Sequence, residues 1–142
     1  MAKRRYWLLK TEPEEFSWRE QVERGEKGEV WSGVRNAGAR NNLQAMKKGD
    51  RAFFYHTGGE RRIVGIVEVI REHYPDPTAG KDEPWVAVDV KAVAALPKPV
   101  TLAEVKSDPG LQGMALVKYP RLSVQPVTEQ EWNIVCRRGG LK

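Results

Sequence analysis

Short, dense runs of apolar residues alternate along the chain with charged, glycine-rich and proline-rich segments. Four of the runs are rich in aromatic and β-branched side chains, as β-strands are, and they cover residues 6–10, 51–56, 63–70 and 85–93. In the first run Trp7 and Leu9 should point to one face of a sheet and Leu8 to the other, because side chains alternate along a strand. The second run alternates too little for a half-exposed strand and suits one that is buried on both sides.

The ends and interruptions of these strands are also visible in the sequence. Gly65 lies inside the third run, where a glycine indicates a bulge or the corner of a barrel. Pro97 and Pro99 follow the fourth run and are expected to end it, and the segment YPDPTAGKDEP, residues 74–84, is expected to be a loop. A last strand pair, or one bent strand, is predicted over residues 116–119 and 122–124.

Three helix starts carry the capping-box pattern, in which a Ser or Thr is followed three residues later by Glu. The pattern begins at Ser17, Thr101 and Thr128, and it predicts a short helix after each of them. Trp18 and Val22 are one helical turn apart and are expected to anchor the first of these helices against the core.

A fourth helix is predicted over residues 36–46, because Ala39, Leu43 and Met46 recur at helical spacing. Asn36 stands at the entrance to this helix. An asparagine in that position is more often an N-cap, whose side chain accepts a hydrogen bond from the helix backbone, than a residue that contacts a ligand.

Five or six short strands and four short helices, interspersed without βαβ regularity, predict an α+β protein whose strands form a small mixed barrel. A chain of 142 residues has the usual size of one domain with one hydrophobic core. We therefore expect residues 1–142 to form a single domain.

Composition adds a basic surface to this picture. The chain has 24 Lys and Arg against 19 Asp and Glu, which gives a formal net charge of +5. The basic residues cluster at positions 3–5, 47–48, 61–62 and 137–138. An excess of this kind suits a polyanionic partner, and an ordinary solvated basic surface explains it equally well. Charge alone therefore leaves the class of partner open.

The single cysteine, Cys136, excludes an internal disulfide and a cysteine-based metal site, and it fits a reducing compartment. It falls on the face of the last predicted helix that carries Trp132 and Val135, so its expected role is core packing. No apolar run approaches the roughly 20 residues of a membrane span, and no signal peptide is recognisable. We expect a cytoplasmic protein without membrane association.

The sequence lacks the common catalytic and cofactor-binding motifs. It has neither a P-loop nor a dinucleotide-binding glycine motif. Its two histidines, His56 and His73, do not have the spacing of metal ligands, and no serine lies in a nucleophile elbow. We therefore expect no cofactor, no metal ion and no catalytic residue.

One segment, residues 31–57, combines flat aromatic side chains with amide and guanidinium groups. Such groups stack on nucleobases and hydrogen-bond to their edges. For each residue alone an ordinary role is more common: Trp31 as a core residue, Asn36 as a helix cap, and His56 as a hydrogen-bonded structural histidine. The segment by itself therefore leaves a pocket for a planar ligand as a hypothesis.

Several motifs, read in order, resemble the EVE domain family of the PUA-like superfamily. The resemblance covers nearly the whole chain and rests on YWLLKTEPEEFSW, WSGVRNAGARNNLQAMKKGDRAFFYHT, IVGIVEVI, YPDPTA, WVAVDV and RLSVQPVTEQEW. It implies a PUA-like mixed β pseudo-barrel flanked by short helices. It also implies a pocket that accepts a modified nucleobase in DNA or RNA, without catalysis.

The resemblance implies a pocket built from separate parts of the chain. Its residues would be Lys10, Thr11, Trp31, Val34, Arg35, Asn36, Tyr55, His56, Pro75, Asp76, Arg121, Leu122 and Ser123. We expect stacking by the two aromatic residues among them, hydrogen bonds to the base edge from Asn36, Asp76 and Ser123, and phosphate contacts from the basic residues. Family members often carry a larger residue at the position of Ala37, so ligand preference does not follow from the resemblance.

Two other functions remain open beside a reader of a modified base. An enzyme that acts on nucleic acid or on a modified nucleotide would use His56 or Asp76 as general base. An interaction adaptor with a vestigial pocket would bind no nucleic acid. The reader hypothesis predicts that Trp31→Ala weakens binding by about 1–3 kcal/mol and leaves the fold intact. The oligomeric state is open, with a monomer favoured.

Overall fold

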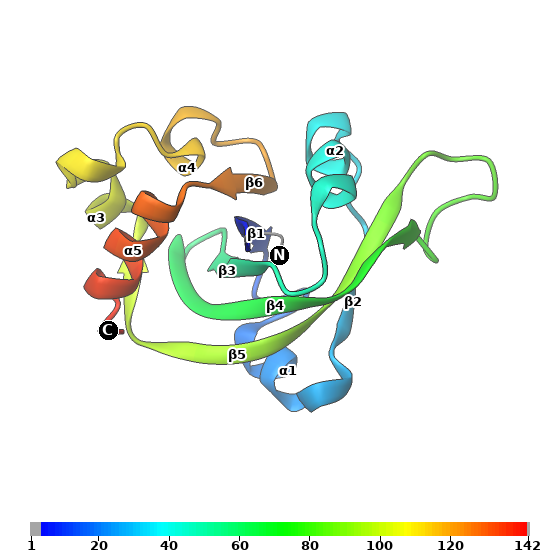
Figure 1. The fold of residues 1–142 in the computed structure, drawn as a ribbon, viewed down its shortest axis with the longest axis horizontal. Coiled ribbons are helices and arrows are strands. Elements are labelled where there is room, and N and C mark those ends of the chain that lie inside the picture. Colours follow the sequence, from blue (N-terminus) through cyan, green and yellow to red (C-terminus); the bar gives the residue numbers. More distant parts are fainter. Residues whose placement is uncertain (1–3, 142) are drawn as a thin grey trace.

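Six strands in one mixed sheet and five short α-helices make up residues 4–141, the part of the chain that the computed structural model describes (Figure 1). The strands are β1 (Tyr6–Thr11), β2 (Glu29–Trp31), β3 (Arg51–His56), β4 (Arg62–Pro75), β5 (Val86–Thr101) and β6 (Val124–Val127). The helices are α1 (Trp18–Glu23), α2 (Ala37–Ala45), α3 (Leu102–Ser107), α4 (Ala115–Lys118) and α5 (Glu129–Arg138), with 3₁₀ turns at Gly25–Lys27 and Pro109–Leu111. The predicted α+β class is confirmed.

The order of the strands in the sheet is β2-β5-β4-β3-β1-β6. Only β1 and β3 are parallel among the described strand pairs, and the other neighbours are antiparallel. β2 and β6 end the sheet without pairing with each other, and α2 contacts both β5 and β6. The sheet is therefore a pseudo-barrel rather than a closed barrel.

The curvature of the sheet comes from the long strands β4 and β5, which bend together across the molecule (Figure 1). Their pairing shifts register at four places, and such bulges bend a strand. Gly65 lies at one of these shifts, as predicted. A Cβ atom at Gly65 would stand 2.5 Å from the ring of Trp18, so the absence of a side chain lets α1 lie directly on the strand.

The expectation that Pro97 and Pro99 end the fourth strand is wrong, because β5 continues through both of them. The neighbour on the other side of β5 is β2, which pairs only with residues 88–90. The prolines therefore lie where no second strand needs their missing N–H groups. The pairing of β5 with β4 also skips the residues between Ala95 and Val100, so both prolines lie in a bulge.

The strand predicted over residues 116–119 is also wrong, since this segment forms α4 and the last strand begins only at Val124. Gln125 gives the physical reason. Its side chain is fully buried, and its Nε2 donates hydrogen bonds to the carbonyl oxygens of Tyr119 (3.1 Å) and Leu122 (2.9 Å). These bonds hold the chain in a turn between α4 and β6.

All three predicted capping boxes are present, at Ser17, Thr101 and Thr128. Asn36 caps α2 by accepting a hydrogen bond of 2.9 Å from the backbone N of Ala39. Each cap satisfies helix N–H groups that have no partner within the helix, which is why these helices begin where the sequence predicts.

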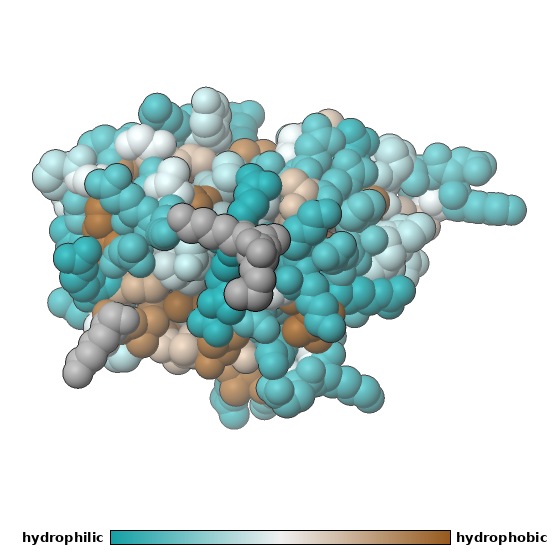
Figure 2. All heavy atoms as spheres, in the orientation of Figure 1, coloured by the Kyte–Doolittle hydropathy of each residue, from teal (hydrophilic) through white to brown (hydrophobic). Residues whose placement is uncertain are grey.

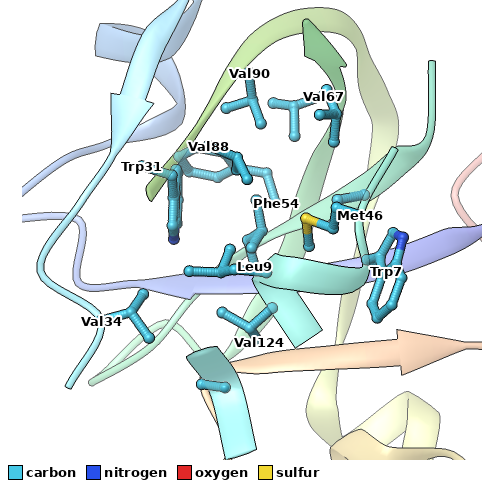
Figure 3. Packing of buried hydrophobic residues seen from close by; sticks show 14 of the residues in the cluster. Trp7, Leu9, Trp31, Val34, Met46, Phe54, Val67, Val88, Val90 and Val124 are labelled. Atoms are coloured by element: carbon cyan, nitrogen blue, oxygen red, sulfur yellow. The ribbon is translucent and has the colours of Figure 1, made fainter. Parts of the chain in front are cut away.

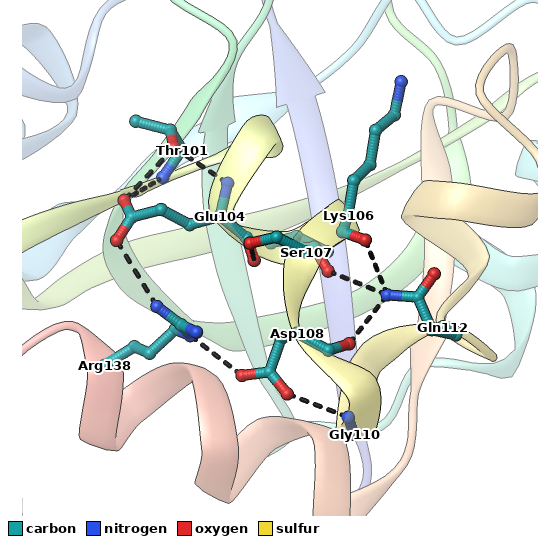
Figure 4. A network of polar contacts seen from close by, with 9 residues as sticks. Thr101, Glu104, Lys106, Ser107, Asp108, Gly110, Gln112 and Arg138 are labelled. Atoms are coloured by element: carbon teal, nitrogen blue, oxygen red, sulfur yellow. Dashed lines mark hydrogen bonds and ion pairs between the residues drawn. The ribbon is translucent and has the colours of Figure 1, made fainter.

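α3 and α5 are joined by an arginine that reaches from one helix to the other (Figure 4). Arg138 Nε donates a hydrogen bond of 2.8 Å to Asp108, and its Nη1 lies 3.5 Å from Glu104, the capping-box carboxylate of α3. The backbone N–H of Thr101, which donates a hydrogen bond to Glu104, is the main reason that the pKa of Glu104 lies below its usual range.

The anchoring of α1 differs from the prediction. Val22 is 50% exposed and does not face the core. Gln21 is buried instead, and its Nε2 donates a hydrogen bond of 3.2 Å to the carbonyl oxygen of Val90. Trp18 makes the main apolar contact of the helix, with its ring 5.3 Å from that of Phe54.

Two hydrophobic clusters lie on opposite faces of the sheet, and β1 contributes to both. Trp7 and Leu9 belong to the first cluster, inside the curved sheet (Figure 3), whereas Leu8 belongs to the second, which α5 covers. This division confirms the predicted alternation along the strand. Cys136 packs against the second cluster, and burial raises the pKa of its thiol to about 11, in keeping with a packing role.

Candidate functional site

A pocket of about 380 Å³ opens at the end of β1, where further segments of the chain meet. Because β1 and β3 are parallel, their ends lie at the same edge of the sheet, and Thr57 N donates a hydrogen bond of 2.9 Å to Thr11 O. The segment before β6 joins them, since Lys10 N donates to Ser123 O (3.0 Å) and Lys10 Nζ to Pro120 O (2.7 Å). The predicted site residues that line this pocket are Lys10, Thr11, Trp31, Val34, Arg35, Arg121 and Ser123.

Trp31 belongs both to the core and to the wall of the pocket. It is only 7% exposed, and its ring makes edge contacts with the rings of Phe54 (5.5 Å) and Phe16 (6.3 Å). The nitrogen end of its indole is turned toward the side where Val34 lies (Figure 3). Truncating a buried tryptophan costs about 3–5 kcal/mol, so the expectation that Trp31→Ala leaves the fold intact does not fit this burial.

Asp76 holds the segment after β2 in place. Its Oδ2 accepts hydrogen bonds from Gly33 N (2.8 Å) and Arg35 Nη1 (3.1 Å), and its Oδ1 accepts from Thr78 N (2.7 Å) and Thr78 Oγ1 (2.6 Å). Burial raises the pKa of Asp76, but the hydrogen bonds from Thr78, Gly33 and Arg35 outweigh burial and lower the pKa below its usual range. The carboxylate is fully buried, so it supports the pocket rather than presenting an edge to a ligand.

Arg35 is held at the rim of the pocket by the turn that joins β4 and β5. Besides its contact with Asp76, its Nη2 donates a hydrogen bond of 3.1 Å to Thr78, and its guanidinium lies 5.8 Å from the ring centre of Trp85. Arg40 lies at the same distance from the same ring. Trp85 was expected only as a strand residue, because sequence spacing does not reveal that this turn folds back onto the segment after β2.

The rim of the pocket carries charges of both signs. Lys10, Arg35 and Arg121 are basic, and Glu12 and Glu15 are acidic. Lys10 contacts a backbone carbonyl, and burial lowers the pKa of its amine. A cation that is already partly desolvated loses little more hydration when an anion binds beside it.

Tyr55 and His56 do not line the pocket. Tyr55 is 3% exposed and belongs to the second cluster. His56 Nε2 accepts a hydrogen bond of 3.0 Å from Trp18 N, and its Nδ1 lies 2.8 Å from Glu60 Oε1. The ring therefore ties α1 to β3. The hydrogen bond from His56 is also the main reason that the pKa of Glu60 is lowered.

The remaining predicted residues do not line the pocket. Asn36 caps α2, Leu122 packs against the first cluster, and Pro75 ends β4. The lining residues that sequence reasoning missed are Glu12, Glu15, Ser32, Gly33, Thr57 and Pro120. Each of them is within four positions of a selected residue, so proximity to the motifs was the available signal.

Residues 4–141 show neither of two further features, a metal site and a membrane-spanning helix. No group of three or more His, Cys, Asp and Glu side chains in this range is arranged to hold a metal ion. In the same range, no helix has the length and apolar character needed to cross a membrane.

The fold and the pocket define a class of protein. A curved mixed sheet of six described strands, flanked by short helices and opening at one edge into a pocket with a polar rim and a tryptophan wall, is a PUA-like domain. Within this class, the EVE domain model matches residues 5–138, and the chain belongs to the EVE domain family. The family and the fold predicted from the motifs are thus confirmed.

Similar proteins come from bacteria and animals. A crystal structure of a protein from Agrobacterium tumefaciens is 54% identical, with a TM-score of 0.94 over 96% of this chain and 94% of that one. Human thymocyte nuclear protein 1, in complex with DNA that contains 5-methylcytosine, is 34% identical, with a TM-score of 0.88 over 97% of this chain and 99% of that one. Chicken thymocyte nuclear protein 1 is 38% identical, and the match covers 92% of this chain but only 66% of that relative's length.

Proposed function

We propose that this chain is a non-enzymatic reader that binds one modified nucleobase of DNA or RNA in the pocket beside Trp31. One observation carries the proposal. The structure of human thymocyte nuclear protein 1 with DNA containing 5-methylcytosine matches 97% of this chain with a TM-score of 0.88. In this proposal the partner is a nucleic acid that carries a modified base, and no cofactor takes part.

The chemistry of the pocket suits a flat heterocycle that has been turned out of a base stack. Trp31 offers an aromatic wall, and the hydroxyl of Ser123 is available for a hydrogen bond to the edge of a base. Lys10, Arg35 and Arg121 give the rim positive charge for the adjoining phosphates. The volume of about 380 Å³ lies within the range of about 300–1,000 Å³ that is typical of small-ligand pockets.

Catalysis is not favoured, because the residues that would act as general base are occupied. Both ring nitrogens of His56 and both carboxylate oxygens of Asp76 make hydrogen bonds with other groups of the protein. A general base must be able to reach the proton that it removes. In the proposal these two residues position α1 and the segment after β2. A cytoplasmic location belongs to the same proposal and rests on the single cysteine.

The experiment that tests this proposal fills the pocket without cutting into the core. Ser123→Leu places apolar bulk in the pocket, and Ser107→Leu, at the exposed end of α3, adds the same bulk elsewhere. Binding would be measured by fluorescence anisotropy on DNA and RNA strands that carry one modified base, 5-methylcytosine first, and on their unmodified counterparts. Ser123→Leu should weaken binding of the preferred modified strand about tenfold or more, since base stacking is worth about 1–3 kcal/mol.

The outcomes of this experiment separate the site from the function. Ser107→Leu should bind each strand with the affinity of the wild-type protein. Both variants should have melting temperatures close to that of the wild-type protein. Unchanged affinity in a folded Ser123→Leu protein would remove the pocket from the proposal. If the wild-type protein binds every modified strand and its unmodified counterpart with equal affinity, the protein does not read a modified base. The mass of the recovered strands should not change, and a change would indicate an enzyme.

A further inference from the structure

The segment that leads away from the pocket carries only positive charge. Residues 30–49 contain no Asp or Glu, and their charged side chains are Arg35, Arg40, Lys47 and Lys48. The segment begins at the pocket, where Arg35 lies on the rim, and runs through α2 to the loop after it. A strand of nucleic acid that follows this segment would meet no carboxylate belonging to it.

The exposed side of α2 carries mainly small and amide side chains. Ala37, Asn41 and Gln44 are exposed and recur at helical spacing, while Ala39 and Leu43 on the other side are buried. The surface over this helix is hydrophilic in the space-filling view (Figure 2). Small and amide side chains let a sugar–phosphate backbone lie close to the helix, and the amides can hydrogen-bond to it.

A basic groove of about 350 Å³ lies at the far end of α2. Arg4, Arg5, Lys47 and Lys48 line it together with Ala45, the last residue of the helix. Lys3, the third member of the basic cluster at the start of the chain, lies outside the described residues. The residues just before β1 and the loop after α2 thus bring together basic clusters that are far apart in the sequence.

The one carboxylate among the lining residues of this groove, that of Asp50, is buried and bonded within the protein. Asp50 is 3% exposed, and its carboxylate accepts hydrogen bonds of 3.0 Å from each of Arg5 N, Trp7 Nε1 and Lys47 N. The guanidinium of Arg5 lies 4.7 Å from the ring centre of Trp7, a contact that holds the cation without using its N–H groups. Arg5, Lys47 and Lys48 form no ion pair with another described residue.

Two carboxylates border the groove and limit the charge that it offers. Glu68 lies 3.2 Å from Arg51 and 4.0 Å from Arg4, and Glu72 accepts a hydrogen bond of 3.1 Å from the backbone N of Lys48. Arg4 is therefore partly neutralised. The side chains of Arg5, Lys47 and Lys48 remain available to an anion.

We propose that this groove binds the phosphodiester backbone of the same strand whose modified base occupies the pocket. The inference rests on the proposed function and adds a second contact to it. α2 has nine residues and is therefore about 14 Å long, at about 1.5 Å per residue. At about 3.4 Å per nucleotide step, the strand reaches the groove about four nucleotides from the modified base.

The test compares strands of different length that carry one copy of the modified base that the protein prefers in the binding experiment above, 5-methylcytosine in DNA first. A short strand extends one nucleotide on each side of the modified base, and two longer strands extend about six nucleotides on the 5′ side only or on the 3′ side only. The protein should bind one of the two longer strands about tenfold more tightly than the short one, because only that strand reaches the groove.

The matched variants are Lys47→Gln with Lys48→Gln in the groove and Lys98→Gln with Arg137→Gln away from it. All four side chains are exposed, and each double variant removes two positive charges. The groove variant should lose the tenfold gain and reduce the slope of log affinity against log salt by about two, which is about one for each lost phosphate contact. It should bind the short strand like the unmodified protein, and the control variant should keep the gain.

The groove inference would be overturned by equal affinity for all three strands, or by equal effects of the two double variants. In either case preferential binding of the short modified strand, compared with its unmodified counterpart, would leave the proposed function standing. If the wild-type protein shows no preference for the short modified strand over its unmodified counterpart, both the proposed function and the groove inference are overturned.

Discussion

At the scale of single residues, one buried carboxylate decides how the pocket is shaped. Asp76 gathers hydrogen bonds from Gly33, Arg35 and Thr78. It thereby connects the turn after β4 with the segment after β2, and it holds an arginine at the rim. The residue was expected to contact a base directly, whereas the structure makes it the support of residues that line the pocket.

Asp76→Asn should lower the free energy of unfolding by about 1–3 kcal/mol at neutral pH, because an amide cannot accept all of these hydrogen bonds. Burial raises the pKa of Asp76, but the hydrogen bonds lower it to below its usual range, which is about 3.9. The contribution of the carboxylate is therefore complete above that value and is lost as the pH falls through the lower, folded-state pKa.

Urea denaturation at neutral pH and at several pH values below about 4 would measure this effect. The difference between the unmodified protein and Asp76→Asn should be constant near neutrality and should shrink in acid. Asp82→Asn changes an exposed carboxylate of the same turn and should have little effect. A difference that does not change with pH would contradict the role assigned to Asp76.

At the scale of elements, α1 lies on the sheet through the contact between Trp18 and Gly65. Three ring atoms of Trp18 stand 2.5 to 2.6 Å from the position that a Cβ at Gly65 would occupy. Gly65→Ala should therefore displace the ring and destabilise the protein by about 1–3 kcal/mol, the usual cost of overpacking.

Thermal melting and tryptophan fluorescence would detect this displacement. Gly113→Ala is the matched control, since no atom lies within 4 Å of a Cβ at that position. It should leave both signals close to those of the unmodified protein. Equal melting temperatures for the two variants would show that α1 does not depend on the glycine.

At the scale of the whole molecule, the sheet separates the core that reaches the pocket from the core that does not. Leu8 and Leu9 are neighbours in β1 and both are 0% exposed. Leu9 shares its cluster with Trp31 and Val34, which line the pocket, and Leu8 belongs to the cluster on the other face.

Leu8→Ala and Leu9→Ala should each lower the free energy of unfolding by about 2–5 kcal/mol. Only Leu9→Ala should also weaken binding of a modified strand, because only that cavity lies behind the pocket wall. Denaturation and anisotropy, at a temperature where both variants are folded, would measure the two effects. Equal loss of binding in both variants would contradict a pocket supported by one face of the sheet.

Local sequence signals predicted most of the elements, because each depends on residues close together in the chain. The caps at Ser17, Thr101 and Thr128 start helices where the pattern predicts, and the alternation in residues 6–10 separates the two clusters. The failed prediction at Pro97 has a cause outside the local sequence. Pro97 remains in β5 because β2, the strand on that side of β5, pairs only with residues 88–90. This pairing depends on strand order and not on sequence spacing.

The candidate site divides in the same way. The resemblance of the motifs to the EVE domain family indicated the family and the segments from which a pocket is built, whereas local propensity and apolar periodicity predicted the α+β class. Only the tertiary structure decided which side chains line the pocket, since the parallel pairing of β1 with β3 and the folding of one turn onto another bring them together. Only the tertiary structure shows that His56 holds α1 and that Asp76 holds the segment after β2. Their hydrogen-bond partners, Trp18 and Gly33, come from distant parts of the chain.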